Sequence, residues 1–421
     1  MKSPDFSRRR FLQGAALLSA PLILPGRVWS QATAPSKRLN VGCIGMGKQM
    51  HGHVGNLLPR DDVQIVAVCD VDTTRREHQR RRIEEAYAKK TGESYKGCAA
   101  YTDFRELLAR KDIDIVLIAT PDHWHTLVNL GAARAKKDVY GEKPLTLTID
   151  EGRRLVGAVR QSGIVLQTGT QQRSSSRFRL ACELVRNGRI GKLQEAKVWL
   201  PAGLCAGPFV TSAVPAGLNW DFWLGPAPMT DYVKERCHRT FRFWYEYSGG
   251  TMTDWGAHMF DIVQWALDMD GSGPVKVDAP KTNGNEFLTY TYANGITMTH
   301  QPWEWNNGIE FVGTEGTLRV QRKKLETSKP ALKDRVIGAN EKHVYASDNH
   351  YKDFLNAIRN RSMPICDVEI GHRTASVCNI GNIAYALNKS LTWNPKSEKF
   401  NDAAANALLG RKMNAQWGIK L

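Results

Sequence analysis

Several features are missing from this 421-residue sequence, and each absence narrows what the chain is. Past the leader region, no uncharged apolar run is long enough to cross a membrane as a helix, so we expect no permanent membrane span. No internal repeat and no low-complexity block is present, which excludes solenoid and array architectures. What remains is a globular chain whose 42% hydrophobic content suffices for two ordinary cores.

The cysteines form no C-x-x-C pair and have no regular spacing, so they indicate neither a zinc site nor a disulfide framework. There are eight: Cys43, Cys69, Cys98, Cys182, Cys205, Cys237, Cys366 and Cys378. Cys43 and Cys69 lie in expected core strands, where a free cysteine packs as a small hydrophobic side chain. One or two bridges among the others stay open as an alternative, because the exported compartment predicted below is oxidising.

Acidic residues are too few to balance the basic ones, which leaves a formal net charge of +16. The first 34 residues carry five Lys or Arg and one Asp, so the rest of the chain keeps +12. The densest basic cluster, residues 75–82, lies in a helical pattern that a solvated helix face explains. Because interleaved aromatic residues and a recognisable binding module are missing, we expect no nucleic-acid partner. Spread over the whole chain, this charge favours an anionic substrate only weakly.

The first 34 residues have the order of an export signal. Ser7-Arg8-Arg9-Arg10-Phe11-Leu12-Gln13 is a twin-arginine pattern, an apolar stretch over residues 14–25 follows, and Ala32-Thr33-Ala34 offers an A-x-A cleavage site. The apolar stretch is too short for a permanent anchor. We therefore predict a twin-arginine signal peptide over residues 1–34, handled by the twin-arginine export machinery, and a periplasmic or otherwise exported mature protein. A retained membrane tether is the alternative.

Apolar strands alternate with helical stretches in the next part of the chain, which is typical of a parallel sheet with crossover helices. The expected strands are Leu39–Ile44, Val63–Cys69 and Ile113–Ala119, the last apolar enough to be buried on both faces. From about Gly169, longer alternating strands predict an α+β domain with an open, mostly antiparallel sheet. These strands are Leu193–Leu200, Glu286–Ala293 and Ile296–Pro302. The fold class is therefore α/β followed by α+β.

A glycine turn follows the first expected strand and opens a helix. Gly45 makes the turn, Met46 follows, and Gly47 lets the backbone approach a phosphate, whereas Met50 stands where G-x-G-x-x-G has its third glycine. Asp70 ends the next strand, 25 residues after Gly45, near the place where an acid accepts hydrogen bonds from an adenosine ribose. The combination predicts dinucleotide binding by these residues, which the glycine motif alone would not.

These features predict a Rossmann NAD(P)-binding domain over residues 35–168, followed by an α+β substrate and oligomerisation domain over residues 169–421. Asp70 favours NAD over NADP, because a carboxylate repels a 2′-phosphate. Arg75 and Arg76 are near enough to keep NADP as the alternative.

Further motifs follow the later strands. They are Thr120-Pro121-Asp122-His123-Trp124-His125, Glu142-Lys143-Pro144, Gly169-Thr170-Gln171-Gln172-Arg173, Trp220-Asp221-x-Trp223-Leu224-Gly225-Pro226 and Gly249-Gly250-x-x-x-Asp254-x-x-x-His258. In this order and spacing the chain resembles the glucose-fructose oxidoreductase, inositol dehydrogenase and rhizopine-catabolism (Gfo/Idh/MocA) family over essentially its whole mature length. The resemblance implies that Thr120, His125, Glu142, Lys143 and Gln171 lie at the cofactor and that the protein is a homo-oligomer.

Oxidation of a sugar alcohol needs a base that takes the hydroxyl proton while hydride leaves for a nicotinamide. Lys143, at a strand end on the cofactor side of the sheet, qualifies if its surroundings lower its pKa, and Glu142 beside it could orient the nicotinamide ribose. Asp254 and His258 are four residues apart, so on one helix both side chains face the same way. The resemblance implies that Lys143, Asp254 and His258 surround the reacting hydroxyl, and which of lysine and histidine is the base stays open.

The substrate side draws on segments near the Asp254 helix. We expect Arg173, His238 and Tyr245 to bind a small carbohydrate, because hydrogen-bonding groups mixed with aromatic surfaces suit a sugar. A zinc site built from His123, His125 and His258 is an alternative that we do not favour, since the first two lie where the resembled family binds nicotinamide. We predict no metal.

Export constrains the reaction, because an exported enzyme has no soluble nicotinamide pool. We therefore expect a tightly held NAD or NADP that is regenerated in place. The first reaction class that satisfies this is hydride transfer between the cofactor and a sugar or sugar derivative. The second is the redox-neutral glycosidase route known in relatives, with transient oxidation at C3, elimination, addition of water and return of the hydride. A non-catalytic sugar-binding or NAD-sensing module is the third.

Overall fold

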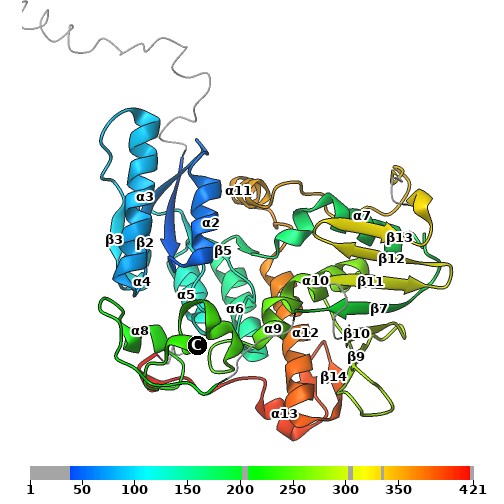
Figure 1. The fold of residues 1–421 in the computed structure, drawn as a ribbon. Coiled ribbons are helices and arrows are strands. Elements are labelled where there is room, and N and C mark those ends of the chain that lie inside the picture. The colour runs from blue at the N-terminus through cyan, green and yellow to red at the C-terminus, as the bar shows by residue number, and fades with distance from the viewer. Residues whose placement is uncertain (1–37, 202–206, 302–306, 333–335, 418–421) are drawn as a thin grey trace, which may run out of the picture.

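A computed structural model of the chain describes residues 38–201, 207–301, 307–332 and 336–417. The predicted signal peptide and Cys205 lie outside the described residues. The other seven cysteines are all free and buried. In the described part of the chain, no helix has both the length and the apolar character that crossing a membrane requires. Two sheets, each with its own helices, lie side by side (Figure 1).

The first sheet has six parallel strands in the order β3-β2-β1-β4-β5-β6. They are β1 (Leu39–Ile44), β2 (Val63–Cys69), β3 (Ala99–Tyr101), β4 (Ile115–Ile118), β5 (Asp138–Gly141) and β6 (Leu166–Thr168). This order confirms the predicted Rossmann fold, in which ligands bind where the strand order reverses at the carboxyl ends. The predicted bounds of β1 and β2 are those observed, whereas β4 is shorter than expected at both ends.

Helices cover both faces of this sheet. On one face α2 (Lys48–Leu57) and α3 (Thr73–Thr91) pack against β1 and β2, and on the other lie α4 (Phe104–Leu108), α5 (Asp122–Arg134) and α6 (Ile149–Ser162). A helix from late in the chain, α11 (His350–Asn360), joins the first face and buries Phe354 and Leu355 in the same apolar cluster. The Rossmann core is therefore completed by residues that lie some 190 positions beyond its last strand.

The second sheet has nine strands in the order β13-β12-β11-β7-β10-β9-β8-β14-β15. They are β7 (Leu193–Trp199), β8 (Lys276–Asp278), β9 (Leu288–Thr291), β10 (Thr297–Gln301), β11 (Gly308–Gly313), β12 (Gly316–Gln321), β13 (Lys324–Thr327), β14 (Ser390–Asn394) and β15 (Lys399–Phe400). All neighbours are antiparallel except β7 and β10, which confirms the mostly antiparallel sheet. The observed strands are shorter than expected here, because β9 and β10 pair only between Leu288 and His300 around the turn at Gly295.

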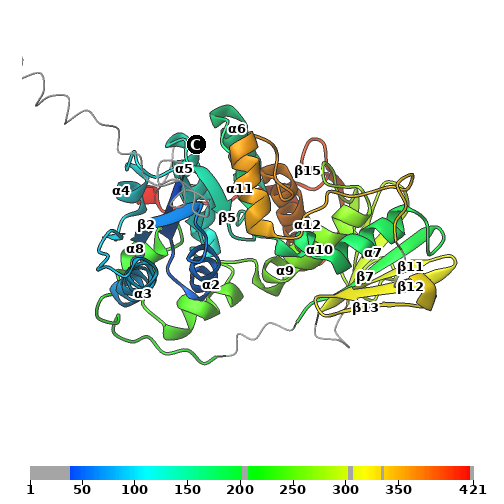
Figure 2. The same cartoon turned by 90° about the horizontal axis from the view of Figure 1, so that it is seen from above.

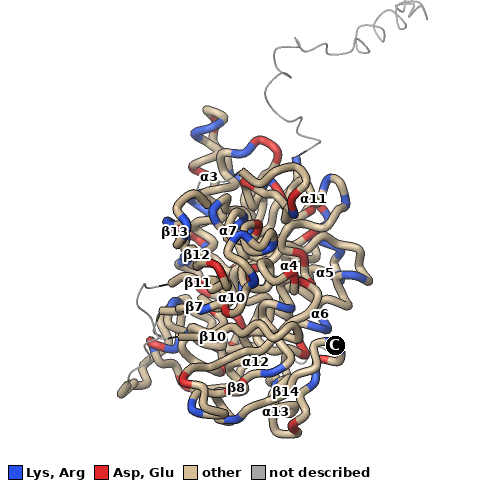
Figure 3. Tube along the Cα trace, turned by 90° about the vertical axis from the view of Figure 1, so that its right-hand side faces the viewer, with Lys and Arg blue, Asp and Glu red and all other residues tan. Residues whose placement is uncertain are grey.

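Three helices bury their apolar faces against the second sheet: α7 (Ser176–Arg186), α10 (Gly256–Ala266) and α12 (Val368–Leu387). Seen from above, they separate this sheet from the Rossmann domain (Figure 2). The long α12 also packs against α6 of the Rossmann domain. Along the trace, basic and acidic residues are interspersed over both domains (Figure 3).

Residues 207–248, here called the strap, leave the second domain and pack on the first. Thr73 N–H donates to Gly217 O (2.9 Å) and Asn219 N–H donates to Val71 O (3.1 Å), so the strap is tied to the loop after β2. The strap contains α8 (Trp220–Leu224) and the 3-10 turns η4 (Lys234–Arg236) and η5 (His238–Phe243). Trp220 and Trp223 stack within it at 4.8 Å and give it an apolar core of its own.

Candidate active site

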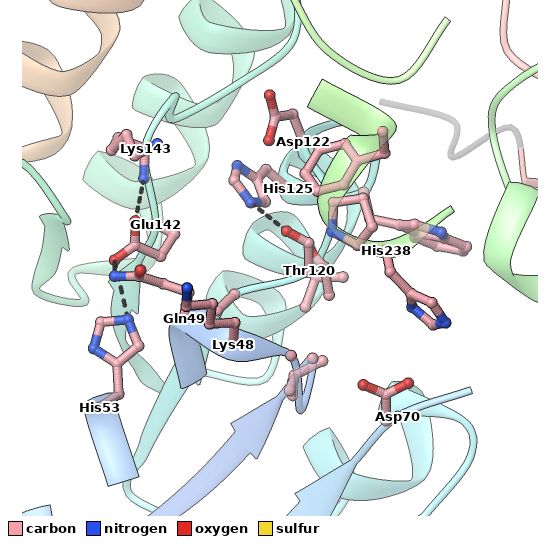
Figure 4. A pocket seen from close by; sticks show the side chains of 18 of the residues that line it. Lys48, Gln49, His53, Asp70, Thr120, Asp122, His125, Glu142, Lys143 and His238 are labelled. Carbon is pink, nitrogen blue, oxygen red and sulfur yellow. Dashed lines mark hydrogen bonds and ion pairs between the residues drawn. The ribbon is translucent and has the colours of Figure 1, made fainter. Parts of the chain in front are cut away.

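A cavity of about 1000 Å³ lies at the carboxyl ends of the Rossmann strands. One half is lined by the loops after β1, β2 and β4, and the other by the short helix α9 (Gly250–Asp254), by α10 and by the hairpin between β12 and β13. The strap covers it with Phe222, Trp223, His238 and Phe241. Figure 4 shows one wall of this cavity.

The glycine turn after β1 is shaped for close approach of the backbone. Gly45 has φ +86°, and a Cβ there would lie 2.6 Å from Ala119 O, so no other residue fits without distortion. Gly47 caps α2, whose first turn holds no acid and whose free N–H groups face the cavity end. The Met46 side chain is buried and its backbone faces a neighbouring smaller cavity.

Asp70 lines the cavity where sequence reasoning expects it, but both of its carboxylate oxygens are already occupied. Met46 N–H donates to Oδ2 (2.6 Å) and Asp72 N–H donates to Oδ1 (2.8 Å). Burial raises the pKa of Asp70 to about 6, although these two backbone donors oppose the shift. In this structure the carboxylate therefore holds the glycine turn against the loop after β2, and it would share its oxygens with a ribose.

Thr120 and His125 form the cavity wall after β4. The imidazole of His125 lies 2.9 Å from Thr120 O and 2.6 Å from Pro144 O, so it fixes the two loops to each other. The Thr120 hydroxyl is buried with no hydrogen-bond partner among the described residues. An unused hydroxyl, a helix N-terminus and a glycine turn with no room for a side chain fit a bound dinucleotide.

Glu142 is buried at the end of β5 and collects hydrogen-bond donors. Gln49 Nε2 donates to it from α2 (2.9 Å), and Gln171 Nε2 donates from the far side (3.2 Å). His53 Nε2 lies 3.0 Å from the same carboxylate, and its Nδ1 lies 2.7 Å from the Tyr351 hydroxyl of α11. Burial opposes ionisation, but His53 and Lys143 outweigh it and lower the pKa of Glu142 to about 2. Glu142 is therefore an ionised, fixed acceptor.

Lys143 reaches across to the second domain. Its Nζ donates to Asp254 Oδ1 (2.6 Å) and to Asp254 O (3.1 Å), and the Arg242 guanidinium pairs with the other carboxylate oxygen. Burial favours the neutral amine, but the carboxylates of Asp254 and Glu142 outweigh it and raise the pKa of Lys143 above 10.5. The condition under which Lys143 would qualify as the base, a lowered pKa, is therefore not met, and Lys143 is an ammonium.

His258 lies beside this pair on α10, with only 7% of the residue exposed. Asp254 and His258 do not share one helix as expected, because α9 ends at Asp254 and α10 begins at Gly256. Both side chains still face the cavity, and Asp254 is bonded to Lys143 and Arg242 rather than to the imidazole. Burial and the charge of Lys143 lower the pKa of His258 to about 3, so the ring is neutral at working pH. Its Nδ1 has no partner among the described residues.

The structure brings together most of the expected site but not all of the expected substrate residues. Arg173 is 1% exposed and pairs with Asp261 and Asp270 behind α10, so it is a buried structural cation outside the cavity. Tyr245 is 74% exposed and outside the cavity. His238 does line the cavity, but 3.4 Å from Asp72, at the end where Asp70 lies.

Sequence reasoning missed several cavity residues, among them Gln49, His53, Asp122 and Arg322. Gln49 and His53 are four apart on the helix after the glycine turn, which was a usable signal. Among the described residues no cluster of His, Cys, Asp or Glu is arranged to hold a metal ion. The alternative zinc ligands are engaged elsewhere, since His123 faces Trp223 O at 2.9 Å and His125 faces two carbonyl groups.

A Rossmann sheet whose nucleotide cavity ends at a lysine, an aspartate and a histidine from a second domain defines a nucleotide-dependent oxidoreductase of two domains. The sequence agrees: residues 39–170 match the oxidoreductase family with an NAD-binding Rossmann fold, and residues 204–419, more than half of the chain, match the C-terminal alpha/beta domain of that family. The chain belongs to the Gfo/Idh/MocA oxidoreductase family.

Relatives match most of the chain or part of it. The chain is 27% identical over 372 residues to myo-inositol 2-dehydrogenase of Thermotoga maritima, which covers 84% of this chain and 96% of that one. It is 31% identical over 172 residues to an alpha-N-acetylgalactosaminidase of Shewanella oneidensis, which covers 35% of each. Among solved structures, levoglucosan dehydrogenase in complex with NADH superposes with a TM-score of 0.59 at 18% identity, over 84% of this chain and 98% of that one.

Proposed function

We propose that the protein is an exported oxidoreductase that transfers hydride between a resident NAD and a hydroxyl group of a sugar or sugar derivative. The observation that carries this proposal is the Lys143–Asp254 ion pair beside a neutral His258, at the end of a dinucleotide-shaped cavity. The similarity to a myo-inositol dehydrogenase over 84% of the chain supports a polyol or sugar substrate. Asp70 supports NAD rather than NADP.

We infer separate tasks for the lysine and the histidine. Bound NAD would supply the hydride acceptor. The neutral imidazole of His258 takes the proton of the substrate hydroxyl, because its Nδ1 has no partner among the described residues and Lys143 is already protonated. The ammonium of Lys143 donates a hydrogen bond to the same oxygen and stabilises the developing alkoxide. Asp254 keeps Lys143 charged and fixes its position.

Two variants test these roles. We expect Lys143→Ala and His258→Ala each to reduce kcat by a factor on the order of 10² to 10⁴ while NAD still binds. Hydride transfer is followed at the cofactor's absorbance, and binding by fluorescence titration. Tyr245→Ala is the matched control, because its side chain is outside the cavity. Full activity in either cavity variant would contradict the assignment.

We further propose that the cofactor stays bound through many turnovers. The strap supports this, because His238 and Phe241 line the same cavity as Gly45 and Asp70 and so cover the nucleotide half. Denaturation of the purified mature protein is expected to release about one nicotinamide dinucleotide per chain, since export by the twin-arginine route carries folded, loaded proteins. A supernatant without nicotinamide would refute the resident cofactor.

Export itself is a separate proposal, supported by the Arg8-Arg9 motif and the apolar stretch after it. The expected result is that the wild-type chain accumulates in the periplasmic fraction with its leader removed. The Arg8→Lys/Arg9→Lys double variant is expected to stay in the cytoplasm at full length. Equal distribution of the two proteins between fractions would argue against the twin-arginine route.

A redox-neutral glycosidase is the second candidate, and the partial similarity to an alpha-N-acetylgalactosaminidase favours it. Its chemistry uses the same hydride step, followed by elimination and return of the hydride. Aryl glycosides separate the two functions. Release of the aglycone with no net change in cofactor absorbance selects the glycosidase, whereas lasting reduction of the cofactor without release selects the oxidoreductase.

A further inference from the structure

Arg322 lies in the hairpin between β12 and β13 and lines the catalytic end of the cavity. Its guanidinium carbon sits over the Trp255 ring, 4.9 Å from the ring centre, and its Nε donates to Gln172 Oε1 (3.0 Å). Gln172 is itself buried and donates to His258 O (3.0 Å). The ring face and the Nε bond hold the guanidinium in one orientation next to the His258 segment.

Two other cations that line this cavity, Lys143 and Arg242, both pair with Asp254. For Arg322, no carboxylate lies within ion-pair distance in the part of the chain that the structure describes. A guanidinium with its Nε and one face occupied presents its two terminal nitrogens as a planar pair of donors, which matches a carboxylate in bidentate geometry.

We propose that Arg322 binds the carboxylate of an acidic sugar, so that the substrate of this enzyme is a uronic acid or a glycoside of one. This inference rests on the proposed sugar oxidoreductase function and adds the substrate class. One guanidinium edge suits a single carboxylate in bidentate geometry. The proposed carboxylate site rests on Arg322 and not on the overall positive charge of the chain.

The position of Arg322 also couples substrate charge to the proposed base. Its positive charge is one of the causes that lower the pKa of His258, after burial and Lys143. A substrate carboxylate paired with Arg322 would offset that charge and raise the proton affinity of His258 only when an acidic sugar is bound. Arg322 would then act on kcat through His258 as well as on KM through binding.

Matched sugar pairs test the proposal on the holoenzyme. Methyl β-D-glucuronide is compared with methyl β-D-glucoside, and methyl α-D-galacturonide with methyl α-D-galactoside, at the cofactor's absorbance. We expect a uronate of at least one pair to exceed its neutral partner in kcat/KM by about 10- to 100-fold, the factor typical of a charge-assisted hydrogen bond. Both kcat and KM are expected to contribute.

Variants of Arg322 provide the second arm. Arg322→Gln is expected to lose the uronate preference, with a fall of about 10- to 100-fold in kcat/KM on the uronate. The result is read as the ratio of uronate to neutral sugar, because loss of the Arg322 charge raises the pKa of His258 with either sugar. Arg322→Lys is expected to restore part of it, because a lysine keeps the charge but not the planar pair of donors. Lys323→Gln, the next residue and outside the cavity, is the control. Melting temperature and NAD affinity identify any variant that fails to fold.

The possible results of these measurements separate the inference about Arg322 from the proposed function. A neutral sugar preferred by the wild-type enzyme, or an unchanged uronate preference in Arg322→Gln, overturns the inference and leaves the proposed function standing. A glucose 6-phosphate preferred over both members of a pair would overturn the carboxylate assignment as well. Absence of hydride transfer with every sugar, despite bound NAD, would overturn the proposed function and this inference with it.

Discussion

At the scale of single residues, Asp122 is, like Asp70, a cavity carboxyl group with a pKa near neutral pH. It begins α5, and the Ser248 hydroxyl donates to its Oδ2 (2.5 Å). Burial raises the pKa of Asp122 to about 6, although His125, Ser248 and Lys143 oppose this. In turn, ionised Asp122 helps to keep Lys143 protonated. A carboxyl group in this position gives the active site a titration near neutral pH.

We predict an acid limb near pH 6 in kcat/KM for the sugar, measured with saturating cofactor so that Asp70 does not interfere. Activity should fall as pH falls through 6, because protonation of Asp122 removes one of the negative charges that hold the Lys143 ammonium in place, whereas Lys143 itself stays charged over this range. Asp122→Asn is expected to remove the limb. Ser248→Ala is expected to move it to higher pH, because the lost hydrogen bond favours the carboxylate. A limb that stays in Asp122→Asn would contradict this.

At the scale of elements, an ion-pair network joins α6 of the Rossmann domain to α12 of the second domain. Arg153 on α6 pairs with Glu369 on α12 (2.8 Å) and with Glu398 just before β15 (2.7 Å). His372 Nε2 lies 2.7 Å from the same Glu398 carboxylate. Gly152 makes room for this contact, since a Cβ there would lie 2.3 Å from the His372 ring. The network therefore fixes how the two domains meet.

Glu398→Gln should lower the free energy of unfolding at pH 7 by about 1–3 kcal/mol, less than a fully buried pair because Arg153 is partly exposed. Burial raises the pKa of Glu398, but His372 and Arg153 outweigh it and lower the pKa to about 2. The stabilising contribution of ionised Glu398 is thus complete above pH 4.5 and is lost as pH falls toward 2. Urea denaturation at pH 7 and pH 3 measures the difference, which should shrink at pH 3.

Lys396→Gln is the control for Glu398→Gln, because Lys396 is exposed and lies two residues before Glu398. It is expected to change the free energy of unfolding by less than about 0.5 kcal/mol. An equal loss in Glu398→Gln at both pH values would show that charge does not carry the effect.

At the scale of the whole molecule, chain order and spatial order differ. Helix α11 packs on the Rossmann sheet, where Tyr351 stacks on Tyr140 at 5.5 Å and Phe354 is buried. The strap likewise leaves the second domain and packs on the Rossmann domain, where it is hydrogen-bonded to Val71 and Thr73. The Rossmann sheet is therefore supported by segments from later in the chain, and we expect the two domains to unfold together.

Phe354→Ala tests this coupling. It should lower the free energy of unfolding by about 3–5 kcal/mol, as for other large-to-small core changes. Because the two domains support each other, the urea midpoints followed by far-UV circular dichroism and by tryptophan fluorescence should fall together. The affinity for NAD should also fall. Met363→Ala, three residues past α11 and 68% exposed, is the control. A separate early transition in one signal alone would contradict a single cooperative unit.

The nucleotide half of the site could be predicted from sequence because parallel strands bring their carboxyl ends to one edge. Gly45, Asp70, Thr120 and Glu142 each follow a strand, so their order in the chain gives their place. The substrate half could not be predicted this way, because proximity to Asp254 in sequence does not say which side of α10 a residue faces.

Arg173 and Arg322 illustrate the difference. Arg173 forms an ion pair with Asp261 of α10 outside the cavity. Arg322 belongs to a hairpin more than 60 residues after Asp254 and lines the cavity. Only tertiary packing separates the two positions. The raised pKa of Lys143 likewise depends on Asp254, which is 111 positions away in the chain.

The position of α11 has a consequence for biosynthesis. A ribosome makes the six Rossmann strands first, yet the face of that sheet stays partly uncovered until residues 350–360 have emerged. We therefore expect the Rossmann domain to complete its fold only after α11 has been synthesised. If the protein is exported with its dinucleotide bound, as proposed above, loading would follow the synthesis of α11 and precede transport.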